Sequence, residues 1–392
     1  LYLLGLFHHL DHQSQHFLLY LQRFSIFYTF TMRIYIYIFI AILLMVGCYN
    51  TPKKQTENTS AEKVTLTDMA GRRVLVPKSI SKAFIDRSSV HLIYALDTLL
   101  PVNRVFNYND SEKKYLKKGF YEGKPYVTST PIEEIIKLQP EVILLTVSLQ
   151  TEAERAKEIE RADILQQKTK IPVVLFSGDF EQYTEALTLL GTLLHKEKEA
   201  QELNAFIEKY CYSIPKVVAT IPEAKRKTIY YAEGMNGLQT EPPTSLHSYL
   251  INYTGGKNIA EVELLPGKGK TNVSIEQIYR WDPDMILVWS GNFDDLYSYK
   301  AIRQEKIWQQ LRAVKENQVY QVPWRPFGWI DRPPGLGRVM GSIWLASLTY
   351  PEYFKGDIVP ITQEFFKKFY HYDMDYIETR DIIGAQPDIT NK

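Results

Sequence analysis

The sequence predicts an α/β protein with two lobes, in which mostly parallel sheets are joined by one long connecting helix. Three observations lead to this fold: a segment that occurs twice, strand and helix patterns that alternate around each copy, and a long helical stretch between the copies. The 392 residues are enough for two domains of ordinary size. The 46 basic and 45 acidic residues nearly cancel, so bulk charge does not indicate a nucleic acid as partner.

The repeated segment comprises residues 132–144 and 275–287, and six of the thirteen aligned pairs are identical. Each copy has the pattern of a short amphipathic helix, then a proline followed by an acid, then a buried strand. Two copies this far apart indicate two similar lobes, and two similar lobes suggest a ligand held between them.

The N-terminal part has the pattern of an export signal. Residues 1–31 precede the first methionine, Met32, and are interpreted as an upstream segment outside the protein. Residues 32–47 combine a basic start, an apolar core and a small residue before Cys48. Gly47-Cys48 resembles the lipobox of bacterial lipoproteins, in which the signal is removed and the cysteine is lipidated. The alternative is an uncleaved membrane anchor, for which the apolar run is short.

The N-terminal lobe is expected over residues 63–179, after a polar tether at residues 48–62. Residues 64–67 and 73–77 alternate in hydrophobicity around a turn and predict a β-hairpin. Strands are expected at residues 83–85 and 173–176, with a helix at residues 89–96. This alternation is typical of a parallel α/β sheet.

Residues 180–213 are predicted to form the connecting helix. Leucines recur near helical spacing, charged residues occupy the other faces, and no proline interrupts before Pro215. Such a helix would span about 50 Å, far more than a crossover needs. The alternative is a long helix packed on one lobe. The second lobe then covers residues 214–392, with a late helix from Gly337 to Leu348.

These features resemble the substrate-binding proteins of ABC importers for iron–siderophore, haem and cobalamin. The resemblance runs from about Val64 to Ile383 and includes the opening hairpin, the twin helix–proline–acid–strand units, Gly255-Gly256-Lys257-Asn258 and the closing helix. It implies a protein on the outer side of the bacterial cytoplasmic membrane, held there by its lipid. Its partners would be an importer permease with its ATPase. A rigid connector implies little closure on ligand binding.

The resemblance also implies two docking residues. In this family one glutamate near the start of the repeated helix on each lobe pairs with arginines of the permease, and Glu133 and Glu276 occupy these positions. For Glu133 a capping role competes, because Thr130-Pro131-Ile132-Glu133 fits a capping box. In the second copy Ser274 and Gln277 fit that box, which leaves Glu276 free.

Candidate ligand contacts follow the carboxyl ends of predicted strands, where open α/β sheets bind their ligands. Arg87 and Ser88 follow the strand at residues 83–85, and a helix start there can hold an anionic group. Ser88 can equally serve as a helix cap, and Arg87 can pair with Asp86. Tyr231, at the end of another predicted strand, can contribute an aromatic face unless strand packing buries it.

The loop of residues 324–334 contains three aromatic residues, two arginines and three prolines. Aromatic stacking and charge-assisted hydrogen bonds from such a loop suit a bulky, partly anionic ligand. We therefore select Trp324, Arg325, Trp329 and Arg332 as ligand contacts. The alternative is a lid that packs against its own lobe.

A metal site on the protein itself is not expected, since His91, His195, His247 and His371 lack paired ligand spacing. Residues 267–271 (Gly-Lys-Gly-Lys-Thr) lack the earlier glycine of a phosphate loop and are interpreted as an exposed basic loop. No catalytic set, resident cofactor or nucleic-acid partner is predicted, and Cys211 is left without a disulfide partner.

The sequence thus predicts a monomeric, lipid-anchored solute-binding protein of an ABC importer. It would capture an iron complex, haem or corrinoid, so that any iron or cobalt belongs to the ligand. The alternatives are a binding protein for a small oxyanion such as molybdate, and a lipoprotein enzyme or sensor on the same frame.

Overall fold

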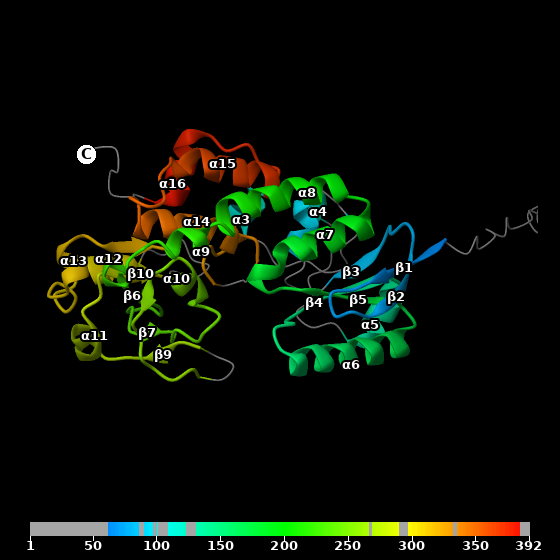
Figure 1. The fold of residues 1–392 in the computed structure, drawn as a ribbon, viewed down its shortest axis with the longest axis horizontal. Coiled ribbons are helices and arrows are strands. Elements are labelled where there is room, and N and C mark those ends of the chain that lie inside the picture. The colour runs from blue at the N-terminus through cyan, green and yellow to red at the C-terminus, as the bar shows by residue number, and fades with distance from the viewer. Residues whose placement is uncertain are drawn as a thin grey trace, which may run out of the picture. The chain divides into compact units, whose positions relative to one another are not determined.

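Two parallel sheets, each flanked by helices, form the framework of the protein (Figure 1). The computed structural model describes residues 62–85, 90–96, 100, 109–122, 131–265, 269–289, 297–331 and 335–384. The predictions for residues 1–61, which include the signal segment, Cys48 and most of the tether, lie outside these ranges.

The N-terminal sheet has the strand order β3-β4-β5, and all three strands are parallel. Its strands are β3 (Ala83–Ile85), β4 (Val142–Val147) and β5 (Val173–Ser177). They are almost entirely apolar, as expected of strands covered on both faces. The helices of this half are α2 (Val90–Ala95), α3 (Asp110–Lys113), α4 (Lys118–Tyr121), α5 (Ile132–Leu138) and α6 (Glu152–Thr169).

The predicted hairpin is confirmed as antiparallel strands β1 (Lys63–Thr67) and β2 (Arg73–Pro77). A buried aspartate in its turn, Asp68, attaches the hairpin to the sheet. The Asp68 carboxylate accepts hydrogen bonds from the backbone N–H groups of Arg72 (2.9 Å) and Leu175 of β5 (3.2 Å), and it pairs with the Arg72 guanidinium at 3.0 Å. Gly71, at φ +87°, allows the chain to reverse there.

The C-terminal sheet has the order β11-β10-β6-β8 and is also parallel. Its strands are β6 (Thr228–Ala232), β8 (Lys257–Asn258), β10 (Met285–Val288) and β11 (Val319–Gln321), and a separate antiparallel pair is formed by β7 (Gln239–Thr240) and β9 (Thr271–Asn272). Its helices are α10 (Tyr249–Tyr253), α11 (Ile275–Trp281), α12 (Tyr297–Gln304) and α13 (Arg312–Lys315).

The repeat is confirmed as α5–β4 in one half and α11–β10 in the other. Both helices end on a left-handed residue, Gln139 at φ 50° and Asp282 at φ 39°, which turns the chain into the proline. The acid after each proline then holds the start of the neighbouring strand. Glu141 accepts from the N–H groups of Ser81 (2.6 Å) and Lys82 (2.9 Å), just before β3.

Asp284 does the same for β6, since it accepts from the Thr228 N–H at 2.7 Å and from the Thr228 hydroxyl at 2.8 Å. The repeated acid is therefore a strand clamp in both halves, a role that the sequence pattern did not show.

The helical connector differs from the single run expected over residues 180–213. The chain forms a short 3-10 turn η2 (Phe180–Gln182) and then α7 (Tyr183–Leu194), which ends at His195 in the left-handed conformation at φ 56°. The chain then reverses, and α8 (Glu197–Phe206) packs back on α7, with the Asn204 amide donating to the Thr184 carbonyl at 2.9 Å.

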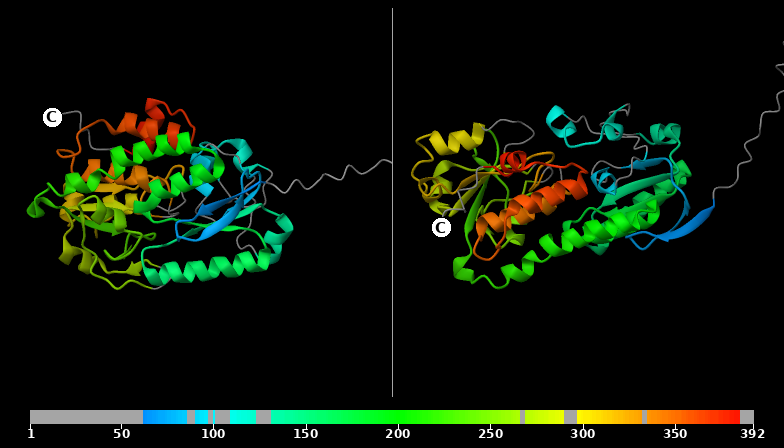
Figure 2. Two further views of the ribbon diagram at one scale, coloured as in Figure 1. Left: turned by 45° about the vertical axis from the view of Figure 1, so that its right-hand side comes forward. Right: turned by 90° about the horizontal axis from the view of Figure 1, so that it is seen from above.

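The connector proper is the helical path of α8, the π-helical turn η3 (Ile207–Cys211) and α9 (Ile214–Val218). Helical periodicity alone could not reveal the break, because the left-handed residue is a histidine rather than glycine or proline. In Figure 2 this green path runs beside the orange helices α14 (Gly337–Thr349) and α15 (Ile358–Phe369). The Cys211 sulfur lies 3.1 Å from the Ser342 hydroxyl of α14.

Besides the connector, a second set of contacts joins the two halves: helices near the C-terminus contact the N-terminal half. The Tyr94 hydroxyl of α2 donates to the Tyr370 carbonyl at 3.1 Å. The Tyr115 hydroxyl donates to Glu378 of α16 (Tyr376–Ile383) at 3.0 Å, and Lys114 forms an ion pair with the same carboxylate at 2.5 Å. The two halves are thus joined by two separate structures, the connector and the pair α15–α16.

One continuous hydrophobic core runs through both halves. It includes Leu144 and Phe176 of the N-terminal sheet, Phe206 of the connector, Tyr231 of the C-terminal sheet and Trp344 of α14, all buried. Each sheet has a smaller core on its other face, centred on Ile143 and Leu175 in one half and on Ile286 and Trp308 in the other. Within the ranges that the structure describes, no helix is long and apolar enough to cross a bilayer.

We expect Asp284→Asn to destabilise the protein by about 1–3 kcal/mol at neutral pH, because the clamp at β6 then loses its charge-assisted hydrogen bonds. Partial burial opposes ionisation of Asp284, but bonds from Thr228 and Arg312 outweigh it and lower its pKa below the usual 3.8. A lowered folded-state pKa contributes stability above the unfolded value, and this is lost as pH falls through the folded value. Urea unfolding should therefore show a difference from wild type at pH 7 that shrinks below about pH 4.

Glu316→Gln is the matched control, since this carboxylate lies exposed in the same half. A pH-independent difference for Asp284→Asn, or an equal effect of Glu316→Gln, would contradict the clamp.

Candidate functional site

The carboxyl ends of the two sheets meet at the junction of the halves. Phe180 lies three residues after the end of β5, and its ring packs edge-on against Tyr253 (5.0 Å between centroids) and Tyr249 (6.1 Å) of α10. His91 of α2 stacks on Phe327, in the loop after β11, at 4.1 Å. Parallel sheets bind ligands at these carboxyl ends, so the site is sought here.

On the N-terminal side, Asp179 ties together the loops after β4 and β5. Its carboxylate accepts hydrogen bonds from the Leu149 N–H at 2.9 Å, the Ser177 hydroxyl at 3.1 Å and the Gln150 amide at 3.3 Å. These bonds fix the edge of the sheet that faces the junction, and they occupy the carboxylate with protein donors.

On the C-terminal side, Trp289, Trp324 and Lys270 form what we call the tryptophan–lysine cluster. Trp289 is the first residue after β10, and Trp324 lies shortly after β11, so adjacent parallel strands bring them together. Their rings are 6.5 Å apart and nearly perpendicular, and the Lys270 ammonium lies 3.7 Å from the centre of the Trp289 ring. Lys270 is half-buried, which corrects the expectation that its loop is simply exposed.

The cluster has chemistry suited to a ligand. The half-buried Trp324 has an indole N–H that finds no hydrogen-bond acceptor among the described residues. A buried donor without an acceptor costs about 1–3 kcal/mol, which an acceptor atom of a ligand can recover. Two indole faces and an ammonium group together favour a ligand with a flat apolar part and a negative charge.

Two predicted ligand contacts lie in the core instead. Tyr231 and Trp329 are both 0% exposed. Tyr231 belongs to the continuous core because β6 is covered on both faces, and the Trp329 indole N–H donates to the Arg325 carbonyl at 2.9 Å. Aromatic residues near a strand end indicate either packing or binding, and only burial distinguishes the two.

Arg325 is exposed in part, but its guanidinium forms an ion pair with Asp381 of α16 at 2.9 Å. It therefore contributes to the attachment of the C-terminal helices. Trp324 lies after β11 with an indole N–H that has no acceptor among the described residues, while Arg87, Ser88 and Arg332 lie outside those residues.

A buried arginine that the sequence analysis missed, Arg338, lies at the junction in the first turn of α14. It is 6% exposed, and its guanidinium carbon is 5.2 Å from the Phe180 ring centre and 5.6 Å from that of Tyr249. Desolvation of an ion costs several kcal/mol, and a desolvated cation–π contact returns about 2 kcal/mol, so the two contacts offset part of that cost. In the sequence, only its position about one helical turn after the loop of residues 324–334 could have indicated Arg338 as a candidate ligand contact.

Two titratable groups near the junction are held neutral by their surroundings. Burial lowers the pKa of His91 to about 4, so this histidine is uncharged at neutral pH. Burial raises the pKa of Tyr183, and the neighbouring Arg338 partly offsets that effect. The Tyr183 hydroxyl donates to the Gly335 carbonyl at 3.3 Å, which leaves its lone pairs to accept from Arg338.

The two predicted docking glutamates occupy equivalent, exposed places in the first turns of α5 and α11. At α5 the structure assigns Pro131 as the N-cap residue, and Thr130, the predicted capping partner of Glu133, lies outside the described residues. At α11 the Ser274 hydroxyl accepts from the Gln277 N–H at 3.2 Å, as predicted. Hydrogen bonds from its own N–H and from Ser274 lower the pKa of Glu276, which keeps it ionised.

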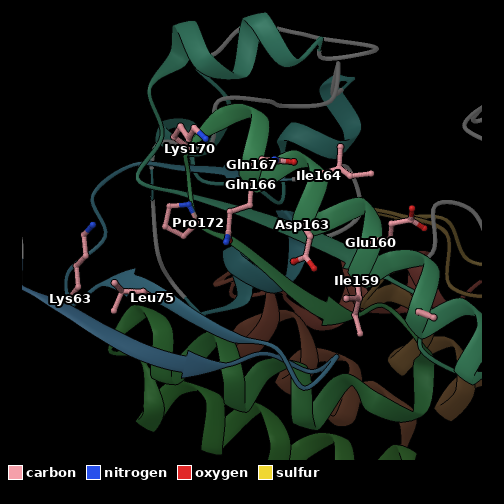
Figure 3. Close-up of a pocket in the computed structure, with 11 residues that line it drawn as sticks. Lys63, Leu75, Ile159, Glu160, Asp163, Ile164, Gln166, Gln167, Lys170 and Pro172 are labelled. Carbon is pink, nitrogen blue, oxygen red and sulfur yellow. The ribbon is translucent and has the colours of Figure 1, made fainter.

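A large groove lies elsewhere, between the β1–β2 hairpin and α6 (Figure 3). Its volume is about 1040 Å³, and Lys63, Leu75, Ile159, Asp163 and Lys170 are among its lining residues. Lys170 and Pro172 precede β5, so the groove lies at the amino end of that strand. It is therefore separate from the carboxyl edge at which parallel sheets bind ligands.

The chain belongs to the periplasmic binding protein family, whose model matches residues 83–326. This confirms the resemblance drawn from the repeat and the connector. The molybdate-binding protein MolA of Haemophilus influenzae is 23% identical over 335 aligned positions, and the match covers 78% of this chain and 90% of that protein. An uncharacterized ABC transporter substrate-binding lipoprotein of Bacillus subtilis, YvrC, is 24% identical over 81% of this chain and 96% of its own length.

A shorter match, 29% identical over 48% of this chain and 57% of the relative, is the iron-uptake system-binding protein of Bacillus subtilis. Among solved structures, an ABC transporter solute binding protein from Sulfurospirillum deleyianum has a TM-score of 0.70 and 29% identity, and the match covers 81% of this chain and 98% of that one. The protein is thus a substrate-binding protein of the ABC-importer type. Its family and its lipoprotein relative indicate an extracytoplasmic location.

We expect Trp329→Ala to affect mainly stability and Trp324→Ala to affect mainly ligand binding. Trp329→Ala removes a fully buried ring and should lower the free energy of unfolding by about 3–5 kcal/mol. Trp324→Ala should cost less stability, because its ring is only half-buried, and should instead weaken ligand binding. Chemical denaturation together with retention of the copurified ligand checks both, and an unchanged unfolding midpoint for Trp329→Ala would contradict the core assignment.

Proposed function

We propose that this protein captures an iron complex, a haem or a corrinoid between its two halves and delivers it to an ABC importer permease. The observation that carries the choice of ligand is the tryptophan–lysine cluster at the carboxyl ends of β10 and β11. Its two indole rings offer area for a flat or bulky ligand, and Lys270 and the orphaned N–H of Trp324 favour acceptor groups on that ligand.

A small oxyanion is the second candidate. The relative that binds molybdate supports it, because its match extends over most of both chains. Arg338 also supports an anionic ligand, since the guanidinium group is buried at the junction. The paired tryptophans weigh against it, because an oxyanion gains little from an aromatic face.

Delivery to a permease would use Glu133 and Glu276. Both carboxylates are exposed in matching first turns, one on each half of the protein. A helix N-terminus favours an ionised carboxylate, so both positions present negative charge to arginines of a partner.

Attachment to the membrane would use Cys48 as the lipidated residue after removal of residues 32–47. The lipoprotein relative supports this proposal. Metabolic labelling with a fatty-acid probe should mark the wild-type protein in membranes, whereas Cys48→Ser should be unlabelled. Equal labelling of the two would exclude this cysteine.

The ligand can be identified from protein purified from its own host. Native mass spectrometry with visible absorbance should reveal a coloured, metal-bearing ligand of several hundred daltons. A retained mass near that of molybdate would favour the oxyanion instead, and conversion of the ligand during incubation would contradict a binding role.

We expect Glu133→Lys combined with Glu276→Lys to abolish ligand import in cells and leave ligand affinity unchanged. The introduced lysines repel the permease arginines. Their helices α5 and α11 precede β4 and β10, whereas the tryptophan–lysine cluster follows the carboxyl ends of β10 and β11. Uptake of the identified ligand and its affinity for the purified protein should be measured in parallel. Glu152→Lys, in the exposed first turn of α6, is the matched control and should import normally. Lost affinity in the double variant would contradict the docking role.

A further inference from the structure

We propose that Arg338 anchors an anionic group of the ligand at the junction of the two halves, so that the ligand itself supplies the counterion of a buried cation. This inference rests on the proposed function and narrows the ligand to one that carries a negative charge. It concerns a residue outside both the loop of residues 324–334 and the tryptophan–lysine cluster.

The first step is the state of the guanidinium group. Arg338 is 6% exposed, and it takes part in no ion pair with a carboxylate of the described residues. Its Nη2 donates a long hydrogen bond of 3.5 Å to the Leu246 carbonyl, the Tyr183 hydroxyl accepts from the guanidinium, and Nε finds no acceptor in the described part of the chain. A guanidinium has five N–H donors, so donors remain available for a ligand.

The second step is the surroundings. Two acids lie near this network: Glu181 is exposed and accepts a hydrogen bond from the Tyr249 hydroxyl, and Asp179 acts electrostatically on Tyr183. The Tyr183 hydroxyl interacts with the guanidinium, the guanidinium lies over the Tyr249 ring, and the first turn of the 13-residue helix α14 adds a positive potential. The helix start and the guanidinium favour an anion, and the planar fork of arginine suits two oxygens of one carboxylate, catecholate or oxyanion.

The third step is position. Phe180 comes from the N-terminal half, whereas Tyr249 and Arg338 come from the C-terminal half. An anion at Arg338 would neutralise the charge that lies between the two halves, and thereby couple ligand binding to the contact between them. The tryptophan–lysine cluster would then hold the bulk of the ligand, and Arg338 its charge.

The test compares wild type with Arg338→Gln, Arg338→Lys and the exposed control Arg161→Gln of α6, all as the full chain in detergent. Titration calorimetry uses four probes: sodium molybdate, the ferric complex of 2,3-dihydroxybenzoate, haemin, and cyanocobalamin, which carries no net charge. We expect at least one anionic probe to bind, and Arg338→Gln to weaken it about 10- to 100-fold, as loss of a charged hydrogen-bond partner predicts. Arg161→Gln should bind as wild type does.

The proposal is overturned if no anionic probe binds wild type more tightly than Arg338→Gln. If that variant does not fold, as judged by circular dichroism, Arg338→Lys decides, because it keeps the charge and loses the fork. Affinity equal to wild type in Arg338→Lys then overturns the proposal. If only molybdate binds in a way that depends on Arg338, the source of the charge is a free oxyanion. If the iron complex or haemin binds in that way, the source is an anionic chelate.

These outcomes are distinct from failure of the proposed function. Tight binding of cyanocobalamin alone would overturn the role of Arg338 and leave import of a metal complex standing. Arg338-dependent binding without any import in cells would confirm the anchor and contradict the transport role.

Discussion

The shared hydrophobic core is the constraint on which the rest of the structure depends. Both faces of each parallel sheet must be covered by other elements. On one face of each sheet, the covering helices belong to the same continuous hydrophobic core. Leu144, Phe206, Tyr231 and Trp344 thus belong to one packing unit, although they come from different halves. Because such interiors are close-packed, the halves cannot separate widely without exposing apolar surface. This favours a binding protein that closes little around its ligand.

The second attachment adds to this constraint. Helices α15 and α16 bind α2 and α3 through Tyr94, Lys114 and Tyr115, and these bonds join segments more than 250 positions apart in the chain. The connector and the C-terminal helices together leave the carboxyl ends of the sheets facing one junction. The candidate ligand groups therefore lie on rigid elements, which suits recognition by preformed geometry.

The candidate site combines flat apolar surface with a buried positive charge, and a small ligand rarely complements both. The tryptophan–lysine cluster offers flat apolar surface, while Arg338 offers a buried charge. The carboxylate of Asp179, by contrast, is fully engaged in holding its own loops. A chelate with aromatic or extended parts and acidic oxygens matches this division better than an uncharged sugar or a simple cation.

The sequence by itself determined the two-sheet architecture, the twin α5–β4 and α11–β10 units and the family, because hydrophobic periodicity and proline–acid turns act over a few neighbouring residues. It also predicted the first-turn positions of Glu133 and Glu276, which are exposed, whereas Trp324 as a ligand contact stays a prediction. Only the tertiary structure decided that Trp329 and Tyr231 are core residues, that Arg325 pairs with Asp381, and that the helical path reverses at His195. The same holds for Trp289, Lys270 and Arg338, whose significance depends on partners distant in sequence. Burial and pairing are properties of three-dimensional neighbours, and a local pattern cannot specify them.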